Sequence, residues 1–115
     1  MLGTVSIRKD AWWFCDISLH EDVNMDWESF KRNAPNLAEA AERLFERSGV
    51  ALVGTIRKDG SPRISPVEPF INDGKLYMGM MWRSLKALDL LRDPRCTVHS
   101  SVSDRMAAEG EFKLH

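Results

Sequence analysis

The sequence predicts a mainly β protein of the α+β class, with an antiparallel sheet curled into a small barrel and two helices beside it. Two tight-turn signals, Asp59-Gly60 and Asn72-Asp73-Gly74, separate apolar and β-branched runs between residues 50 and 80. Apolar residues at helical spacing precede these runs, and a helix that begins after Ser84 follows them. Hairpins next to a helix start rich in Ser, Lys and Arg indicate a barrel with an anion site on its wall.

Composition sets the broad class. The chain has 115 residues, of which 43% are hydrophobic and 29% charged, as expected for one globular domain that we place at residues 25–115. Sixteen basic and seventeen acidic residues give a formal charge of −1, so the overall charge does not favour a nucleic-acid partner. No apolar run approaches the roughly 20 residues of a membrane span, and no signal peptide is evident. These features predict a cytoplasmic protein without a membrane or nucleic-acid partner.

The two cysteines, Cys15 and Cys96, lie far apart and have no metal-ligand spacing around them. The pattern therefore favours reduced thiols over a disulfide, and it predicts no metal site.

Residues 1–24 form an N-terminal arm in this interpretation. Thr4 to Ile7 could be a short strand. The large side chains of Trp12-Trp13-Phe14 cannot all face one core from a single strand, because successive residues point to opposite faces. A structural arm that packs on a partner and a loosely held extension remain equal alternatives.

A helix is predicted from about residue 35 to residue 49. Leu37, Ala41, Leu44 and Phe45 form one apolar stripe, Pro35 suits the first turn, and Gly49 supplies the stop.

Strands are predicted at residues 50–56, 63–71 and 75–80. The second of them contains Pro66 and Pro69, which cannot donate a backbone hydrogen bond to a neighbouring strand. That strand should therefore be an edge, be bulged, or be open to a ligand over this length. In the third strand, Met78 and Met80 could fill the core or could contact a cofactor.

Ser84 is a predicted N-cap for a short helix from Leu85 to Arg92, whose leucines at positions 85, 88 and 91 recur at helical spacing. Strands at residues 95–102 and 106–115 follow. A closed barrel needs at least one more strand, so either a partner subunit covers the open edge or the chain is a fragment.

Arg63, Arg83, Ser84 and Lys86 form the candidate anion site. A helix N-terminus favours an anion, an arginine can bind a phosphate with two hydrogen bonds, and a lysine adds a point charge. The alternative is an ordinary N-cap with solvated basic neighbours.

No catalytic motif accompanies these residues. The chain lacks GxSxG, HExxH, GxGxxG and P-loop patterns. Asp59 lies in a tight turn, where an aspartate more often shapes the backbone than acts as a base. No catalytic residue can be assigned, so an enzyme of this kind would take its reactive atom from a cofactor.

The run Thr55-Ile56-Arg57-Lys58-Asp59-Gly60-Ser61-Pro62-Arg63-Ile64-Ser65-Pro66-Val67, with Asp73-Gly74-Lys75-Leu76-Tyr77, Ser84-Leu85-Lys86-Ala87 and Leu91-Arg92-Asp93-Pro94-Arg95, resembles the pyridoxamine phosphate oxidase-like family. The resemblance covers residue 37 to about residue 115. It implies an FMN-binding split β-barrel of Greek-key-like antiparallel topology, in which some relatives use a deazaflavin coenzyme instead.

The resemblance also implies roles for single residues. Arg63, Lys86 and the Ser84 hydroxyl match positions that hold the FMN phosphate. The backbone of Ile64, Ser65, Pro66 and Val67 matches the strand along the isoalloxazine ring, with Met78 and Gly79 on the strand beside it. The N–H groups of Ser65 and Val67 are expected to face ring heteroatoms. Leu85 departs from the pattern, since some members have a second basic residue there.

The family site is built between two subunits, so the resemblance implies a homodimer with the cofactor at its interface. The family also continues beyond the equivalent of residue 115, so the resemblance implies that the C-terminal part of the usual barrel lies outside these 115 residues. The resulting hypothesis is a flavin-dependent oxidoreductase, with FMN or a deazaflavin, acting on a small molecule. The alternatives are a flavin- or haem-binding protein without turnover and an inactive structural dimer, because one fold hosts many functions.

Overall fold

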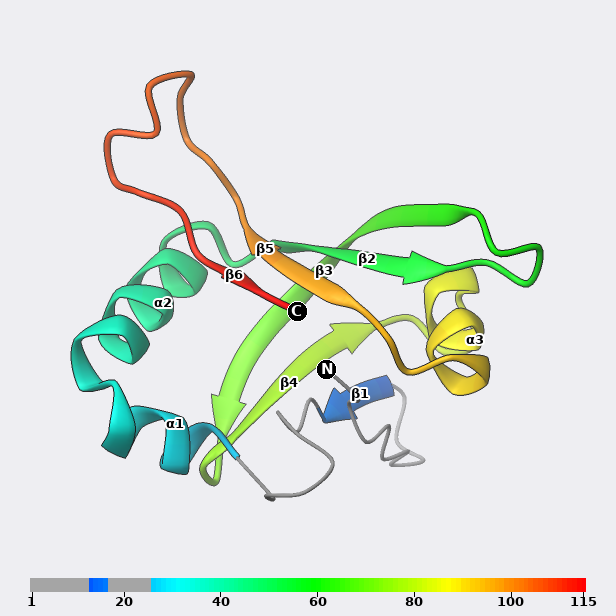
Figure 1. Ribbon diagram of the computed structural model, residues 1–115, viewed down its shortest axis with the longest axis horizontal. Coiled ribbons are helices and arrows are strands. Elements are labelled where there is room, and N and C mark those ends of the chain that lie inside the picture. Colours follow the sequence, from blue (N-terminus) through cyan, green and yellow to red (C-terminus); the bar gives the residue numbers. More distant parts are fainter. Residues whose placement is uncertain (1–12, 17–25) are drawn as a thin grey trace.

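The computed structural model describes residues 13–16 and 26–115, the first of these ranges by its backbone alone. The chain is an α+β protein, as predicted, with six antiparallel strands in the order β1-β4-β3-β2-β5-β6 and three helices among the described residues. The sheet does not close on itself, and the helices α1 and α2 lie at one end of it while α3 lies at the other (Figure 1). No helix in the described ranges is long and apolar enough to cross a membrane. The elements are β1 (Trp13–Asp16), α1 (Trp27–Asn33), α2 (Pro35–Ser48), β2 (Ala51–Ile56), β3 (Pro62–Asn72), β4 (Lys75–Met80), α3 (Leu85–Arg92), β5 (Thr97–Ser100) and β6 (Lys113–Leu114).

Strand β3 joins the two halves of the sheet. Residues 62–67 pair with β2, and residues 68–72 pair with β4, so each half of β3 has a partner strand on one side within the described chain. Of the alternatives that the sequence left open for this strand, the structure has an edge strand, on a different side in each half.

The register explains how β3 tolerates its prolines. Pro62 and Pro66 occupy even-numbered positions of β3 and lie opposite Ile56 and Leu52 of β2. Pro69 occupies an odd-numbered position and lies opposite Met78 of β4. Backbone polar groups alternate in direction along an antiparallel strand, so each proline nitrogen points to the side that has no partner strand. The three prolines therefore cost the sheet no hydrogen bond.

Both predicted turns are confirmed. In the second, Asp73 and Gly74 have φ angles of 51° and 71°, the positive values of a two-residue type I′ hairpin turn. A Cβ atom on Gly74 would lie 3.1 Å from the Cβ of Glu28, because α1 packs on this turn. In the first turn, the Asp59 carboxylate accepts hydrogen bonds from the backbone N–H and the hydroxyl of Ser61, so it shapes the turn as expected.

Helix α2 has the predicted bounds and ends at Gly49 in the left-handed conformation. Its buried stripe is shifted from the predicted one, since Ala38 is fully buried whereas Leu37 is 52% exposed. Helix α1 was not predicted. The Asp26 carboxylate caps it by accepting from the Ser29 N–H at 2.9 Å.

An aromatic cluster joins the two helices to the C-terminal strand. The Trp27 ring lies 6.5 Å from that of Phe45 and 6.4 Å from that of Phe112, centroid to centroid, and the Trp27 indole N–H donates to Glu42 at 2.9 Å. Trp27 is buried, and its ring also meets Phe30 edge-on at 5.1 Å. Contacts of this geometry add to the stabilisation that burial provides.

Helix α3 has the predicted bounds, and Ser84 is its N-cap, with the hydroxyl oxygen accepting from the Ala87 N–H at 3.4 Å. The predicted apolar stripe, however, faces outward: Leu85, Leu88 and Leu91 are 61%, 38% and 41% exposed. The buried side is instead formed by Ala87, Asp89 and Leu90. The helix is therefore turned so that a carboxylate faces the sheet.

The predicted strand over residues 106–115 is wrong for most of its length. Residues 101–112 form a long excursion, and only Lys113–Leu114 pair with β5, which itself spans 97–100 rather than 95–102. Arg47 holds the excursion by donating to the Ser101 carbonyl oxygen and by an ion pair with Glu109. The alternating polarity of residues 106–112 therefore belongs to an anchored loop and not to a paired β-strand.

At the other end of the chain, β1 pairs antiparallel with β4, from Trp13 opposite Met80 to Asp16 opposite Tyr77. This part of the predicted arm is thus a strand of the sheet. The predicted strand from Thr4 to Ile7 and the residue Trp12 lie outside the described residues.

Candidate functional site

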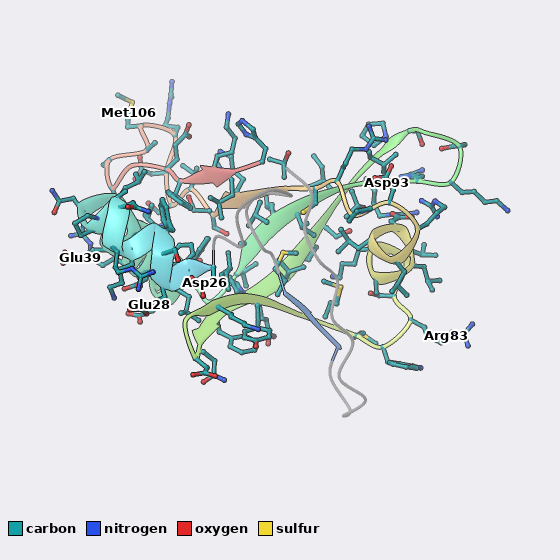
Figure 2. All side chains as sticks on the ribbon, turned by 60° about the horizontal axis from the view of Figure 1, so that its bottom comes forward. Asp26, Glu28, Glu39, Arg83, Asp93 and Met106 are labelled. Carbon is teal, nitrogen blue, oxygen red and sulfur yellow. The ribbon has the colours of Figure 1, made fainter. Side chains whose placement is uncertain are left out.

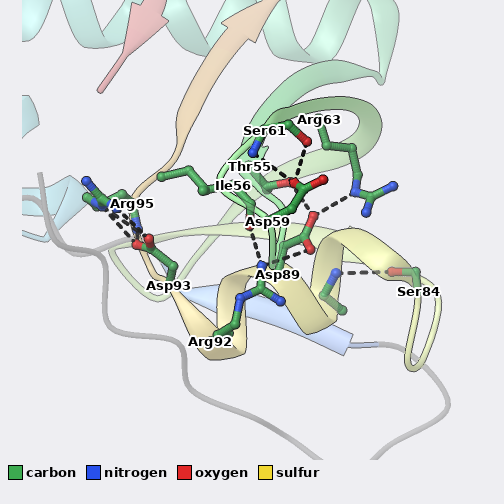
Figure 3. A network of polar contacts seen from close by, with 11 residues as sticks. Thr55, Ile56, Asp59, Ser61, Arg63, Ser84, Asp89, Arg92, Asp93 and Arg95 are labelled. Carbon is green, nitrogen blue, oxygen red and sulfur yellow. Dashed lines mark hydrogen bonds and ion pairs between the residues drawn. The ribbon is translucent and has the colours of Figure 1, made fainter.

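A buried carboxylate connects α3 to the sheet. Asp89 is only 3% exposed, and its Oδ2 atom accepts hydrogen bonds from Arg63 Nε at 2.6 Å and from Thr55 Oγ1 at 2.9 Å. Its Oδ1 atom accepts from Arg92 Nη2 at 3.2 Å, and Arg92 also donates to the Ile56 carbonyl oxygen. Figure 3 shows these donors, which come from β2, β3 and α3, gathered around the carboxylate.

Burial alone would raise the pKa of the Asp89 carboxyl, but the hydrogen bonds from Arg63, Thr55 and Arg92 outweigh it and hold the pKa below its usual range. Asp89 is therefore ionised at neutral pH. Two arginines share this single carboxylate, so the cluster keeps a net positive charge.

Lys86 makes a second link between α3 and β3, where its ammonium group donates to the carbonyl oxygen of Pro66. Burial lowers the pKa of Lys86. Its partner is a carbonyl oxygen and not a carboxylate, so its charge is not neutralised there. Since residues 86 and 89 of α3 meet Pro66 and Arg63 of β3 in turn, the helix runs antiparallel to this part of the strand.

A hollow of about 190 Å³ lies at the fork where β3 leaves β2 and joins β4. Glu68 and Lys86 are the titratable side chains that line it. Gly79 lets the two strands lie close together beside the hollow, because a Cβ atom at position 79 would lie 3.4 Å from the Cβ of Glu68. The complete lining is Val50, Pro66, Val67, Glu68, Gly79, Met80, Met81 and Lys86.

Four of the predicted site residues meet at this hollow: Pro66, Val67, Gly79 and Lys86. Met78 does not, because its side chain is fully buried in the core, which was the alternative left open for it. Arg63 and Ile64 line a different hollow, of about 410 Å³, toward the start of β5, where Arg95 and Cys96 also lie. Burial raises the pKa of the Cys96 thiol to about 11, so this thiol is inert at neutral pH.

Of the three remaining predicted residues, Ser65 is half-buried in β3 opposite Val53 of β2, and the other two lie at the start of α3. Ser84 caps the helix, and its hydroxyl can still donate one hydrogen bond. Arg83 has a φ of 54°, in the left-handed region, and its side chain projects outward from the molecule (Figure 2). Arg83 is exposed and is not among the residues that line the hollow.

The expected ring-facing N–H groups need correction. The Arg57 N–H donates to the Ser61 carbonyl oxygen at 2.8 Å across the β2–β3 turn, so by the alternation along the strand the N–H groups of Ser65 and Val67 point toward β2. The same alternation directs the N–H and C=O of Ile64 to the unpaired side. Ile64 is thus the residue whose backbone polar groups are offered to a ligand along this part of β3.

Asp89 and Glu68 were not predicted as site residues from the sequence. One signal was available for Asp89, since the pattern Leu88-Asp89-Leu90 sets an acidic residue among the apolar positions of a short helix. Its role depended on which face of that helix was buried, and the leucine spacing indicated the wrong face.

Searches of protein-family models, curated proteins and solved structures found no match to this chain. Among the described residues, no group of three or more His, Cys, Asp or Glu side chains could hold a metal ion.

Proposed function

We propose that the chain binds a flavin that carries a phosphate, FMN or a deazaflavin coenzyme, and acts as a flavin-dependent oxidoreductase on a small molecule. The observation that supports this most is the arrangement along the unpaired side of β3, where the Arg63 guanidinium and the Lys86 ammonium are both held against the strand by α3. A flat ligand with an anionic end suits a strand that offers backbone polar groups beside two cations.

The residues fit the phosphate end of such a cofactor. Asp89 occupies the Nε–H of Arg63, whereas the terminal nitrogens of this guanidinium, a planar group that matches phosphate geometry, have no hydrogen bond or ion pair within the described chain. Lys86 and the hydroxyl of Ser84 would complete the phosphate contacts. The positive charge retained by Arg63, Arg92 and Lys86 over Asp89 favours a dianion there.

The ring would lie along the backbone of β3 from Ile64 to Val67, with Gly79 beside it. When bound, a flavin ring accepts and gives up hydride, and the chain supplies anchoring, ring contacts and exclusion of water. With Lys86 assigned to the phosphate, Glu68 is the titratable side chain at the hollow that could hold or move a proton.

The hollow of about 190 Å³ is smaller than the roughly 300–1,000 Å³ of typical ligand sites, which supports completion by a second subunit. Exposed apolar side chains favour the same conclusion: Met81, which lines the hollow, and Ile64 of β3 are each 73% exposed, and Leu85 at the start of α3 is 61% exposed. We therefore propose a homodimer of split β-barrels with the cofactor at its interface, in a cytoplasmic protein.

Titration of the purified protein with FMN and with the deazaflavin coenzyme, followed by flavin fluorescence, tests the proposal. We expect saturable binding of one of the two, weakened at least tenfold when Lys86→Ala and Arg63→Ala are combined, because each loses a charge-assisted hydrogen bond of about 1.5–3 kcal/mol. The matched control is Arg32→Ala with Arg105→Ala, which removes two exposed cations elsewhere and should leave binding unchanged. Failure of the unaltered protein to bind either cofactor would exclude the proposal.

A binder without turnover is the second candidate, and one observation favours it: the described side chains at the hollow include no histidine, cysteine or tyrosine that could act as an acid or base. Reduction of the bound flavin by NADPH, or turnover with a reduced deazaflavin, would identify the enzyme. A bound cofactor that neither process reduces or oxidises would identify the binder.

A further inference from the structure

Arg63 is held at one atom only. Its Nε–H donates to Asp89 Oδ2 at 2.6 Å, and within the described chain no other side chain forms an ion pair with its guanidinium. The side chain is 20% exposed, so the remaining donors of the guanidinium can reach a ligand. A hydrogen bond at Nε restricts the orientation of the guanidinium, and this orientation decides where its terminal nitrogens point.

The carboxylate that holds Arg63 is itself immobilised. Asp89 is 97% buried, and its two oxygens also accept from Thr55 at 2.9 Å and from Arg92 at 3.2 Å. It lies in α3, whose N-terminus is capped by Ser84. Contacts from β2 and α3 thus fix the carboxylate before any ligand arrives, and fixing a binding group in advance lowers the entropic cost of binding.

On the basis of the proposed function, we propose that Asp89 is a positioning residue: it aims the Arg63 guanidinium at the phosphate of a bound flavin and so sets the preference for phosphorylated over unphosphorylated flavin. Asp89 itself does not touch the ligand.

Charge and positioning predict opposite effects when Asp89 is neutralised. If Asp89 acted only through its charge, Asp89→Asn would make the site more positive and would strengthen the binding of a phosphate. If Asp89 acts by aiming Arg63, the same substitution loosens the guanidinium and weakens phosphate binding. The sign of the change in FMN affinity therefore separates the two.

The test compares dissociation constants for FMN and for riboflavin, which lacks the phosphate, by fluorescence titration of the full chain. We expect Asp89→Asn to raise the constant for FMN about tenfold, as loss of one oriented charge-assisted hydrogen bond would, with the constant for riboflavin unchanged. Arg63→Ala should reduce the affinity for FMN relative to that for riboflavin at least as much. Combining the two substitutions should then cause no further loss, because both remove the same contact.

Asp26→Asn is the matched control, because it makes the same substitution at the N-cap of α1, where the side-chain oxygen of asparagine can also accept from the Ser29 N–H; its affinity ratio of FMN to riboflavin should stay at the wild-type value. Should Asp89→Asn fail to fold, Arg63→Lys carries the test. It keeps the charge but has no planar fork, and it should lose the preference about tenfold.

An unchanged or increased affinity ratio of FMN to riboflavin in Asp89→Asn, an unchanged ratio in Arg63→Lys, or an equal loss in Asp26→Asn would overturn the positioning role while leaving flavin binding intact. Absence of flavin binding by the unaltered protein would overturn the proposed function, and the positioning role with it.

Discussion

The orientation of α3 gives the sharpest prediction about stability, because it decides which leucines hold the helix on the sheet. Leu90 is 1% exposed and belongs to the core, whereas Leu85 is 61% exposed on the opposite side of the same helix. We expect Leu90→Ala to lower the free energy of unfolding by about 3 kcal/mol, within the range for fully buried leucines. Leu85→Ala should change it by less than about 1 kcal/mol, because most of this side chain is already in contact with water.

Urea unfolding followed by tryptophan fluorescence measures both values, and alanine in each case preserves helix propensity, so the pair is matched. For a chain of this size, about 3 kcal/mol corresponds to a decrease in Tm of roughly 10–15 °C. Measurements at several protein concentrations separate folding from association, since Leu85 lies on the face assigned to the dimer. An equal cost for the two substitutions, or a larger one for Leu85→Ala, would refute the orientation of α3 and with it the placement of Asp89.

Three further outcomes are expected. Gly74→Ala should destabilise the fold by about 1–2 kcal/mol in urea unfolding, more than Gly60→Ala, because both strain a positive φ but only Gly74 also meets a neighbouring side chain, at 3.1 Å. With the other cysteine replaced by serine, Cys96 should react with iodoacetamide at pH 8 far more slowly than a free thiol, since a pKa of about 11 leaves about one thiolate in a thousand; labelling at the rate of a small thiol would contradict its burial. The Asp89 carboxyl has a lowered pKa in the folded state, so its contribution to stability is present above the unfolded-state pKa of about 4 and is lost as the pH falls through the folded value. The stability gap between wild type and Asp89→Asn should therefore be widest near pH 7 and narrow below pH 4, and a gap independent of pH would contradict it.

Local sequence signals predicted turns and helix ends correctly where a residue type strongly favours one backbone conformation or one capping role. Asp73-Gly74 has the positive φ angles of a tight hairpin, Gly49 ends α2 in the left-handed conformation, and Ser84 caps α3. Helix α1 was not predicted although Asp26 is an ordinary N-cap, because a helix of seven residues is too short to show a repeated apolar spacing. Such signals depend on a few neighbouring residues, so they can be found without the fold.

The sequence by itself determined the α+β class, the two hairpin turns, the bounds of α2 and α3, and the presence of a basic, proline-interrupted strand. Only the tertiary structure decided which face of α3 is buried, because three leucines at helical spacing fit a core and a solvent-exposed stripe equally well until the sheet is in place. It also decided that β3 changes partner strand between Val67 and Glu68, which gives its prolines unpaired sides and turns the Ile64 backbone outward. Above all, it brought Asp89 to Arg63 across 26 residues of sequence. That pairing depends on helix rotation and strand register together, and neither can be determined from local spacing.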